Sequence, residues 1–376
     1  LGDVYKRQPF ALATLVSISI VLVAPFMGQL QSYLRRSMST RAYVLLFGVG
    51  VLVAIAAAVL YAVSRIRGGR GWRLALLGLA LVCGGAFMWV NGTPYAVVNA
   101  VERVHFVEYG LIALLFYRAW KPAGDLSMIV LPLLASFTVG TCDEWLQWFI
   151  PVRVGEAHDV LMNLAAIVCG LMFACALEPV RHYSWRPSPA SLRSMARGAA
   201  LAWLVFATFV SQVHLGYDVI VDSAAVFHSH YTADELLARQ QDRLSRWSSD
   251  PPRTLRRLSR EDQYLDEGIW HIRRRNVAEP FEAFNENLIL ERFFAPVLDI
   301  PTYASPAASR WPPDQRRAVE AAIAGAERAT LMSQAEPYPI VTWRRDVYWT
   351  VVVLVAGALF VTPLFAIRRQ NVEQRP

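Results

Sequence analysis

Ionisable and amide side chains occur on three consecutive apolar segments of the chain, between residues 99 and 170. On the first segment, Glu102, His105 and Tyr109 are spaced by three and four residues, and Glu108 precedes Tyr109. This spacing places Glu102, His105 and Tyr109 on one face of a helix. A carboxylate, an imidazole and a phenol on one face can share protons, accept hydrogen bonds or bind a cation.

The second and third segments carry polar groups at matching spacings. Asp143, Glu144 and Gln147 lie within about one helical turn, and Asp159 and Asn163 are four residues apart. If the three helices alternate in direction, these groups share one depth with those of the first segment. We therefore expect the three helices to build one polar site near the outer face of a membrane.

Arg153 lies between the second and third segments, in the turn Pro151-Val-Arg153. Its guanidinium fork can hold a carboxylate or a phosphate through two hydrogen bonds. A charged side chain at the bilayer centre costs ~2.5–3.5 kcal/mol on insertion scales, so such residues rarely face lipid. This convergence favours a functional site, and the alternative is a purely structural polar lock. The predicted site comprises Glu102, His105, Glu108, Tyr109, Asp143, Glu144, Gln147, Arg153, Asp159 and Asn163.

The composition indicates a membrane protein with one sizeable soluble region. The chain has 376 residues, of which 55% are hydrophobic and 18% charged, and its mean hydropathy is +0.31. Soluble domains carry about 25% charged residues. The net charge of +7 is typical of basic cytoplasmic loops, and we expect no nucleic-acid binding. All four cysteines lie in apolar segments, so we expect no disulfide, no zinc site and no cofactor.

Eight segments have the length of about 20 mostly apolar residues that a transmembrane helix needs. The Arg and Lys residues of the short loops place both ends of the chain in the cytoplasm and the long 217–346 segment outside it. The predicted fold class is therefore all-α, a polytopic helical membrane protein with about eight transmembrane helices. The predicted spans run near residues 9–29, 43–63, 73–92, 103–119, 126–149, 159–178, 197–216 and 347–367.

The 217–346 segment is predicted to be a helical extracytoplasmic domain between the last two spans. Thr232-x-x-Glu235 forms a capping box, and Pro280 and Pro313 are typical first residues of helices. No strand-like alternation is convincing. The predicted division is a non-native leader at 1–8, N-terminal transmembrane helices at 9–72, a transmembrane domain at 73–178, a cytoplasmic loop and seventh span at 179–216, the extracytoplasmic domain at 217–346, and a last span with a cytoplasmic tail at 347–376.

Two further motifs lie in the soluble region. His228-Ser-His230, with Asp222 nearby, favours an exposed polar turn over a metal site, because a helix follows it. The Arg273–Arg275 run, beside Trp270 and His271, favours a solvated helix face over contact with anionic headgroups.

The combined spacing of the polar residues resembles the VanZ-like family of bacterial membrane proteins. The pattern reads Glu102-x-x-His105-x-x-Glu108-Tyr109-Gly110, then Asp143-Glu144-x-x-Gln147-x-x-x-Pro151-x-Arg153, then Asp159-x-x-x-Asn163. The resemblance covers roughly residues 75–178. It implies a multi-pass protein of the bacterial inner membrane in a cell-envelope context, because the family takes its name from a protein linked to teicoplanin resistance. It supplies no reaction. The stretch 155–158 that intervenes before Asp159 departs from the family's usual turn.

Three functions compete for the polar site. The first is binding or handling of a lipid-linked envelope precursor or another amphiphile at the outer leaflet. The second is an enzyme acting on a lipid headgroup, with His105 or Glu102 as general base and Asp143 and Glu144 binding a divalent cation. The third is a proton-coupled transporter, weakened by the lack of broken spans and of two matching halves. We rank binding first; no motif defines catalytic residues, and the protein partner of the 217–346 segment is undefined.

The predicted topology is open to a labelling test in intact cells. Single cysteines at Ser248 and at Arg70, each in a cysteine-free background, are treated with a membrane-impermeant thiol reagent. Because Ser248 is predicted to lie outside and Arg70 in a cytoplasmic loop, we expect Ser248→Cys to react and Arg70→Cys to react only after lysis. The reverse pattern would invert the topology.

Overall fold

The computed structural model describes residues 2–150, 153–221, 225–254, 257, 259–305, 307–325, 331–334 and 336–373, with side chains excluded for 2–7 and 362–373. The predicted leader at 1–8 thus falls mostly outside the described side chains. Contacts divide the chain into two compact units. Unit 1 comprises Leu1–Gln147, Gly155–Phe209 and Thr350–Pro376, and unit 2 comprises Trp148–Val154 and Val210–Trp349. The finer division into domains stays a prediction.

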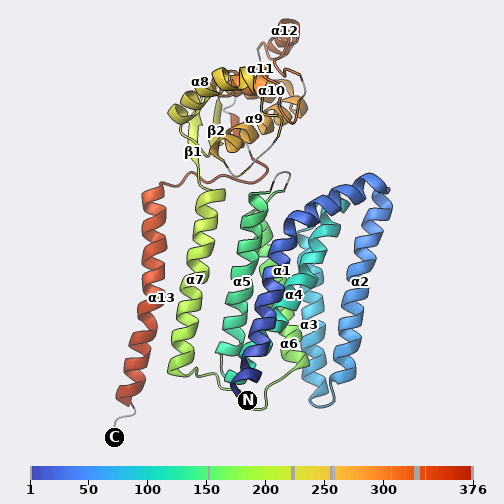
Figure 1. Cartoon of the computed structure of the whole chain (residues 1–376), viewed down its shortest axis with the longest axis vertical. Coiled ribbons are helices and arrows are strands. Elements are labelled where there is room, and N and C mark those ends of the chain that lie inside the picture. The colour runs from blue at the N-terminus through green and yellow to red at the C-terminus, as the bar shows by residue number, and fades with distance from the viewer. Residues whose placement is uncertain are drawn as a thin grey trace. The chain divides into compact units, whose positions relative to one another are not determined.

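Unit 1 is built from long helices that run side by side (Figure 1). Each predicted span corresponds to one helix. The short 3₁₀ turn η1 (Lys121–Ala123) follows α4. The helices are α1 (Gly2–Ser37), α2 (Thr40–Arg65), α3 (Arg70–Val90), α4 (Ala96–Trp120), α5 (Ser127–Trp148), α6 (Ala157–Leu177), α7 (Pro189–Val213) and α13 (Arg345–Glu373).

Six of these helices are long and apolar enough to cross a membrane: α1 from Gln8, α2, α3, α5, α6 and α7. The chain therefore has the features of a multi-pass membrane protein. The predicted total of eight spans is confirmed for these six by length and composition. It stays a prediction for α4, which carries four charged residues in its interior and last turn, and for α13, whose side chains are described only to Val361.

Helix α4 packs against α1, α2 and α6, so its polar residues have protein neighbours. Gly110 of α4 and Gly170 of α6 make the closest approach: a Cβ added at Gly170 would lie 2.6 Å from the Cα of Gly110. Small residues let transmembrane helices come this close. Around the contact, Ile112, Phe116 and Ile167 are buried in one apolar cluster. The glycine pair therefore sets the distance between α4 and α6.

The end of α6 is fixed by a buried arginine. Arg73 of α3 donates from Nε to the carbonyl of Ala176 at 2.6 Å and from Nη2 to that of Leu177 at 2.7 Å. The last carbonyls of a helix lack intrahelical donors and carry the negative end of the helix dipole. Arg73 satisfies both needs and joins α3 to α6.

Unit 2 contains a small sheet, and the prediction of an all-helical segment is wrong in this respect. The strands β1 (Tyr217–Ile220), β2 (Ala225–Ser229) and β3 (Leu331–Gln334) lie in the order β1-β2-β3. β1 and β2 are antiparallel, with Asp218 opposite His228, whereas β2 and β3 are parallel, with His228 opposite Gln334. The alternation was missed because the inward positions of β2 and β3 include Ser229 and Ser333, which are polar.

Unit 2 also contains five helices, of which α10 contacts β2 and β3: α8 (Ala233–Ser249), α9 (Arg260–Val277), α10 (Pro280–Phe293), α11 (Ala295–Asp299) and α12 (Pro313–Ala322). The predicted capping box is confirmed, since Thr232 and Glu235 satisfy each other's backbone at the start of α8. The predicted starts at Pro280 and Pro313 are also confirmed.

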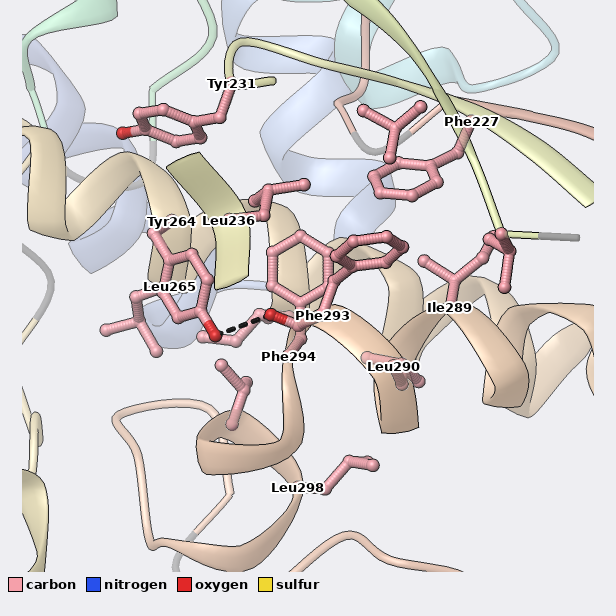
Figure 2. Close-up of a cluster of buried hydrophobic side chains, with 14 of the residues drawn as sticks. Phe227, Tyr231, Leu236, Tyr264, Leu265, Ile289, Leu290, Phe293, Phe294 and Leu298 are labelled. Carbon is pink, nitrogen blue, oxygen red and sulfur yellow. Dashed lines mark hydrogen bonds between the residues drawn. The ribbon is translucent and has the colours of Figure 1, made fainter. Parts of the chain in front are cut away.

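An aromatic core holds unit 2 together. Figure 2 shows Phe227 of β2, Leu236 of α8, Tyr264 of α9 and Phe293 of α10 around one apolar cluster. The hydroxyl of Tyr264 donates to the carbonyl of Phe293 at 2.7 Å, so its polar end is satisfied inside the core. This cluster fixes α9 and α10 against the sheet.

The chain enters and leaves unit 2 at neighbouring points. The amide of Val341 donates to the carbonyl of His214 at 2.6 Å, and the amide of Gly216 donates to the carbonyl of Val341 at 3.1 Å. A Cβ at Gly216 would lie only 2.3 Å from the carbonyl oxygen of Ser229, so glycine is required there. The segment that follows α7 is therefore hydrogen-bonded to the segment that precedes α13.

The glycine contact between α4 and α6 predicts that alanine destabilises the protein at Gly170 but not at Gly48. Gly170→Ala should lower the free energy of unfolding by about 1–3 kcal/mol, because the added methyl overpacks against the backbone of α4. Gly48→Ala, in α2, meets nothing within 4 Å and should be neutral or slightly stabilising. Thermal unfolding of the full chain in detergent measures both. Equal shifts for the two variants would contradict the close contact.

Candidate functional site

The centre of the predicted site is Asp143 on α5. The hydroxyl of Tyr109 on α4 donates to Asp143 Oδ2 at 2.9 Å. The amide of Gln147, one turn further along α5, donates to the same oxygen at 3.0 Å. The spacing of four residues predicted from the sequence therefore brings Asp143 and Gln147 together on one helix face.

Glu144, next to Asp143, joins α5 to α6. Its Oε1 accepts a hydrogen bond from Asn163 Nδ2 at 3.1 Å and a longer one from Gln147 Nε2 at 3.4 Å. Gln147 thus contacts both carboxylates. Three helices contribute to one hydrogen-bonded network, as the sequence predicts.

These five residues are almost fully removed from the surface, with exposed fractions of 0–3%. We call them the polar centre: Tyr109, Asp143, Glu144, Gln147 and Asn163. Hydrogen bonds to carboxylates are strong, and they are stronger in surroundings of low polarity. The network therefore fixes the positions of both carboxylates inside an apolar helix bundle.

His105 lies one turn before Tyr109 on α4 and is held by it. The two rings are nearly parallel, with an interplanar angle of 5° and centroids 5.9 Å apart. A ring nitrogen of His105 and one oxygen from each of Asp143 and Glu144 all lie within 4.8 Å of one another. The imidazole is thus close enough to the carboxylates to share a ligand with them.

Gly140 on α5 makes room for the polar centre and was missed by the sequence analysis. A Cβ at this position would lie 3.3 Å from both Cε1 of Tyr109 and Cβ of Asn163. A methyl group at this position would therefore press on both side chains, which would have to yield by a few tenths of an ångström. A glycine three residues before a buried acid in an apolar segment is the only signal that the sequence offers for it.

The other predicted residues are placed as follows. Glu102 lies on α4 within electrostatic range of His158 at the start of α6, and Glu108 and Asp159 are half-buried on α4 and α6. Their membership of the site stays a prediction. Arg153 belongs to unit 2, where its carbonyl accepts a hydrogen bond from Arg257 Nη1 at 3.1 Å. Its pairing with the acids stays a prediction, and Pro151 lies outside the described residues.

An apolar groove of about 270 Å³ is lined in part by α4 and α6, the helices that carry Tyr109 and Asn163. It is formed by α2, α3, α4 and α6, with Ala58, Leu81, Phe106 and Gly170 among its lining residues. On α4, Phe106 and Gly110 line the groove, and each is adjacent in sequence to a residue that faces the polar side, His105 or Tyr109. Polar and apolar surfaces therefore occupy neighbouring stripes of one helix.

The comparisons with known proteins agree with this location. A family model described as VanZ/LLP1 matches residues 84–178. That segment includes α4, α5 and α6 and every residue of the polar centre. The VanZ-like resemblance is thereby confirmed over this segment, which is a minor part of the chain. Searches of curated proteins and of solved structures gave no match.

Unit 2 holds a second cluster of ionisable groups, formed by His230, Glu267 and Glu336. His230 Nδ1 lies 2.9 Å from Glu267 Oε1, and Nε2 lies 3.0 Å from the carbonyl of Val213. Both ring nitrogens thus face acceptors, so the imidazole must donate from both and carries a positive charge. A metal needs an unprotonated nitrogen. This cluster is therefore a buried ion pair and a poor metal site.

A second network of the same kind joins Ser333, the inward-facing serine of β3, to α9 and α10. Ser333 Oγ donates to Glu286 Oε1 at 2.5 Å, and His271 Nδ1 lies 2.6 Å from Glu286 Oε2. Ser229 Oγ donates to Glu267 in the same way at 2.6 Å. Both serines thus bind a buried glutamate that also contacts a histidine.

Two predictions for the soluble region, the exposed turn at His228–His230 and the solvated face at Arg273–Arg275, are wrong. His230 is 8% exposed and does not lie in an exposed polar turn, whereas His228 contacts Asp218 and Gln334 across the sheet; Asp222 lies outside the described residues. The Arg273–Arg275 run does not form a solvated face throughout. Arg275 is buried and donates to Asn287 at 3.0 Å.

The ion pair in unit 2 predicts a stability that falls as pH rises. Burial, reinforced by the charge of Asp266, raises the pKa of Glu336 from 4.5 to about 8. Burial alone would lower the pKa of His230, but its hydrogen bond to Glu267 and the charge of that group raise it from 6.5 to about 9. Both folded groups thus retain protons that the unfolded chain has lost. The stabilisation is full at low pH and disappears as pH rises to about 9, most steeply between 6.5 and 8.

We expect unit 2 to lose on the order of 5 kcal/mol of stability between pH 6 and pH 9, about half of it from each group. Hydrogen exchange of the α9 amides in the full chain, corrected for intrinsic rates, measures it. Glu336→Gln should about halve the dependence, because the amide cannot ionise whereas His230 still titrates. His228→Gln, on the opposite side of β2 from Ser229, should keep it. A stability independent of pH in the unsubstituted chain would refute the buried ion pair.

Proposed function

We propose that the protein binds an amphiphile, with the headgroup at the polar centre and an acyl chain in the apolar groove. The observation that carries this proposal is the adjacency of the two surfaces on α4. His105 and Tyr109 belong to the polar side, whereas Phe106 and Gly110 line the groove. A molecule with a polar head and an apolar tail matches both surfaces at once.

The groove suits a lipid chain because of where it lies. Three of the four helices that form its walls, α2, α3 and α6, are long and apolar enough to cross a membrane. An open apolar groove at that depth has hydrocarbon, not water, as its surroundings. The VanZ-like segment, residues 84–178, supports a cell-envelope context in a bacterial inner membrane. Within that context, the amphiphile would be a membrane lipid or a lipid-linked envelope precursor.

The hydrogen bonding favours binding over catalysis. The hydroxyl of Tyr109 is engaged with Asp143, and the amides of Gln147 and Asn163 hold the carboxylates. These contacts orient the carboxylates of Asp143 and Glu144 as hydrogen-bond acceptors for a headgroup. They also keep the Tyr109 hydroxyl bound to Asp143 as a donor. The proposal therefore assigns the polar centre a positioning role toward a headgroup.

A groove-filling substitution tests this proposal. Gly85 of α3 lines the groove and has nothing within 4 Å of its added Cβ, so Gly85→Phe can enter the groove without a backbone clash. We expect it to reduce crosslinking of a phospholipid that carries a diazirine on its acyl chain severalfold at groove residues. The crosslinked peptides are mapped by mass spectrometry on the full chain.

Gly78→Phe is the matched control. Gly78 lies on the same helix, also has nothing within 4 Å and does not line the groove. Both variants change helix propensity by the same amount. Equal crosslinking in the two variants would show that lipid does not occupy the groove, and the proposal would fail.

A further inference from the structure

We propose that a second groove of unit 1, at the end of the helix bundle away from the polar centre, binds an anionic phospholipid of the surrounding bilayer. This site is separate from the proposed function, because the second groove shares no lining residue with the first. Its evidence is an apolar groove with exposed tryptophans in its lining, and two arginines beside that lining with no acidic partner.

The second groove has a volume of about 480 Å³ and is lined almost entirely by apolar side chains. Its walls are the first turns of α3 and α5, the last turns of α6, and residues of the 179–185 loop. Four residues of α6 line it at helical spacings of three and four: Val168, Leu171, Met172 and Cys175. Cys169 and Gly170 line the first groove instead, so α6 carries the two grooves on different faces.

The second groove extends from the end of the bundle into its apolar part. Along α6, Val168 lies seven residues before Cys175, which at 1.5 Å per residue is about 10 Å. The helices α3, α5 and α6 are each long and apolar enough to cross a membrane. Walls of this kind face hydrocarbon in a bilayer, so an acyl chain suits the groove.

Two tryptophans indicate where the headgroups lie. Trp72 and Trp185 both line the second groove, and their exposed fractions are 54% and 76%. Tryptophan is enriched where the hydrocarbon of a bilayer meets its headgroups, because the indole ring is amphipathic. The end of the groove that carries these two residues is therefore expected at the level of the headgroups.

Three loops meet at this end of the bundle and are joined by polar contacts. Arg73, which follows the loop between α2 and α3, donates to the last carbonyls of α6. Arg118, at the end of α4, pairs with Glu178 after α6 at 2.6 Å. In the loop between α4 and α5, Asp125 accepts a hydrogen bond from the amide of Ser188 at 3.1 Å. The charges of all three loops therefore surround the same end of the bundle.

These loops have a large surplus of positive charge. Residues 65–73, 118–125 and 178–197 contain nine arginines and one lysine but only two acids, Asp125 and Glu178. Serines bind Asp125, and Arg118 and Lys121 pair with Glu178. Arg181 and Arg186, by contrast, are exposed and form no ion pair with any described residue.

The position of the two unpaired arginines selects the headgroup. Arg181 follows Val180 and Arg186 follows Trp185, and both of these neighbours line the second groove. A guanidinium group can hold a phosphate through two hydrogen bonds. A zwitterionic headgroup brings a cation of its own, which the surplus positive charge repels, whereas an anionic headgroup does not. Basic pockets between transmembrane helices bind anionic headgroups for this reason.

Phosphatidylglycerol and phosphatidylcholine with the same diazirine-bearing acyl chain are the probes. The full chain is reconstituted in nanodiscs of phosphatidylcholine with a trace of either probe, and crosslinked peptides are mapped by mass spectrometry. We expect the lining residues of α5 and α6 to favour phosphatidylglycerol by roughly 10- to 30-fold, since each unpaired arginine near the surface contributes about 5-fold. The double variant Arg181→Gln/Arg186→Gln should remove this preference.

Arg193→Gln is the matched control for charge. Arg193 lies in the first turn of α7, is exposed and is not adjacent to a lining residue, so the preference should remain. Val168→Phe fills the second groove and should reduce crosslinking of both probes there. The same substitution at Val82, which is exposed on α3 and lines neither groove, should not. Gel filtration identifies any variant that fails to fold.

Three results would overturn the inference: equal crosslinking of the two probes in the parent, an unchanged preference in Arg181→Gln/Arg186→Gln, or equal crosslinking in Val168→Phe and Val82→Phe. Gly85→Phe blocks only the first groove, so it should leave phosphatidylglycerol crosslinked at the second. Failure at the second groove therefore leaves the proposed function standing.

Discussion

Two adjacent carboxylates inside an apolar helix bundle are the constraint on which unit 1 depends. Asp143 and Glu144 are nearly inaccessible to solvent, and buried charged groups need partners. Tyr109 of α4, Gln147 of α5 and Asn163 of α6 donate to them, so the three helices must lie at hydrogen-bonding distance. The glycines at 110, 140 and 170 permit this approach. The polar network and these glycines thus hold α4, α5 and α6 together at one level of the bundle.

The sequence predicts the polar centre well because polar residues stand out in apolar segments. Tyr109, Asp143, Gln147 and Asn163 follow helical spacings, and the structure joins them by hydrogen bonds. The groove could not be predicted in this way. Its lining residues are ordinary apolar residues of transmembrane helices, and only packing decides which of them leave a gap. The role of Gly140 could not be predicted either, because it depends on neighbours from other helices.

Unit 2 was predicted less well, and the reason is chemical. Sequence patterns treat polar residues as exposed, yet Ser229, Ser333 and His271 are fully buried. The serines interrupt the apolar alternation of β2 and β3 because they bind Glu267 and Glu286 beneath the sheet. The helix starts were predicted correctly, since a capping box and a first-turn proline are local signals. Partners that are distant in sequence left no comparable signal.

The two buried networks solve the same problem differently, and the difference bears on function. In unit 2, Glu267 contacts a histidine that must be charged, and Arg257 pairs with Asp266 at 2.5 Å. Such pairs balance charge within the protein and have no need of a ligand. In the polar centre, a phenol and two amides, from Tyr109, Gln147 and Asn163, donate hydrogen bonds that orient Asp143 and Glu144. Oriented acids beside a histidine and an apolar groove are the arrangement on which the proposed amphiphile binding rests, whereas the network of unit 2 has the properties of a structural lock.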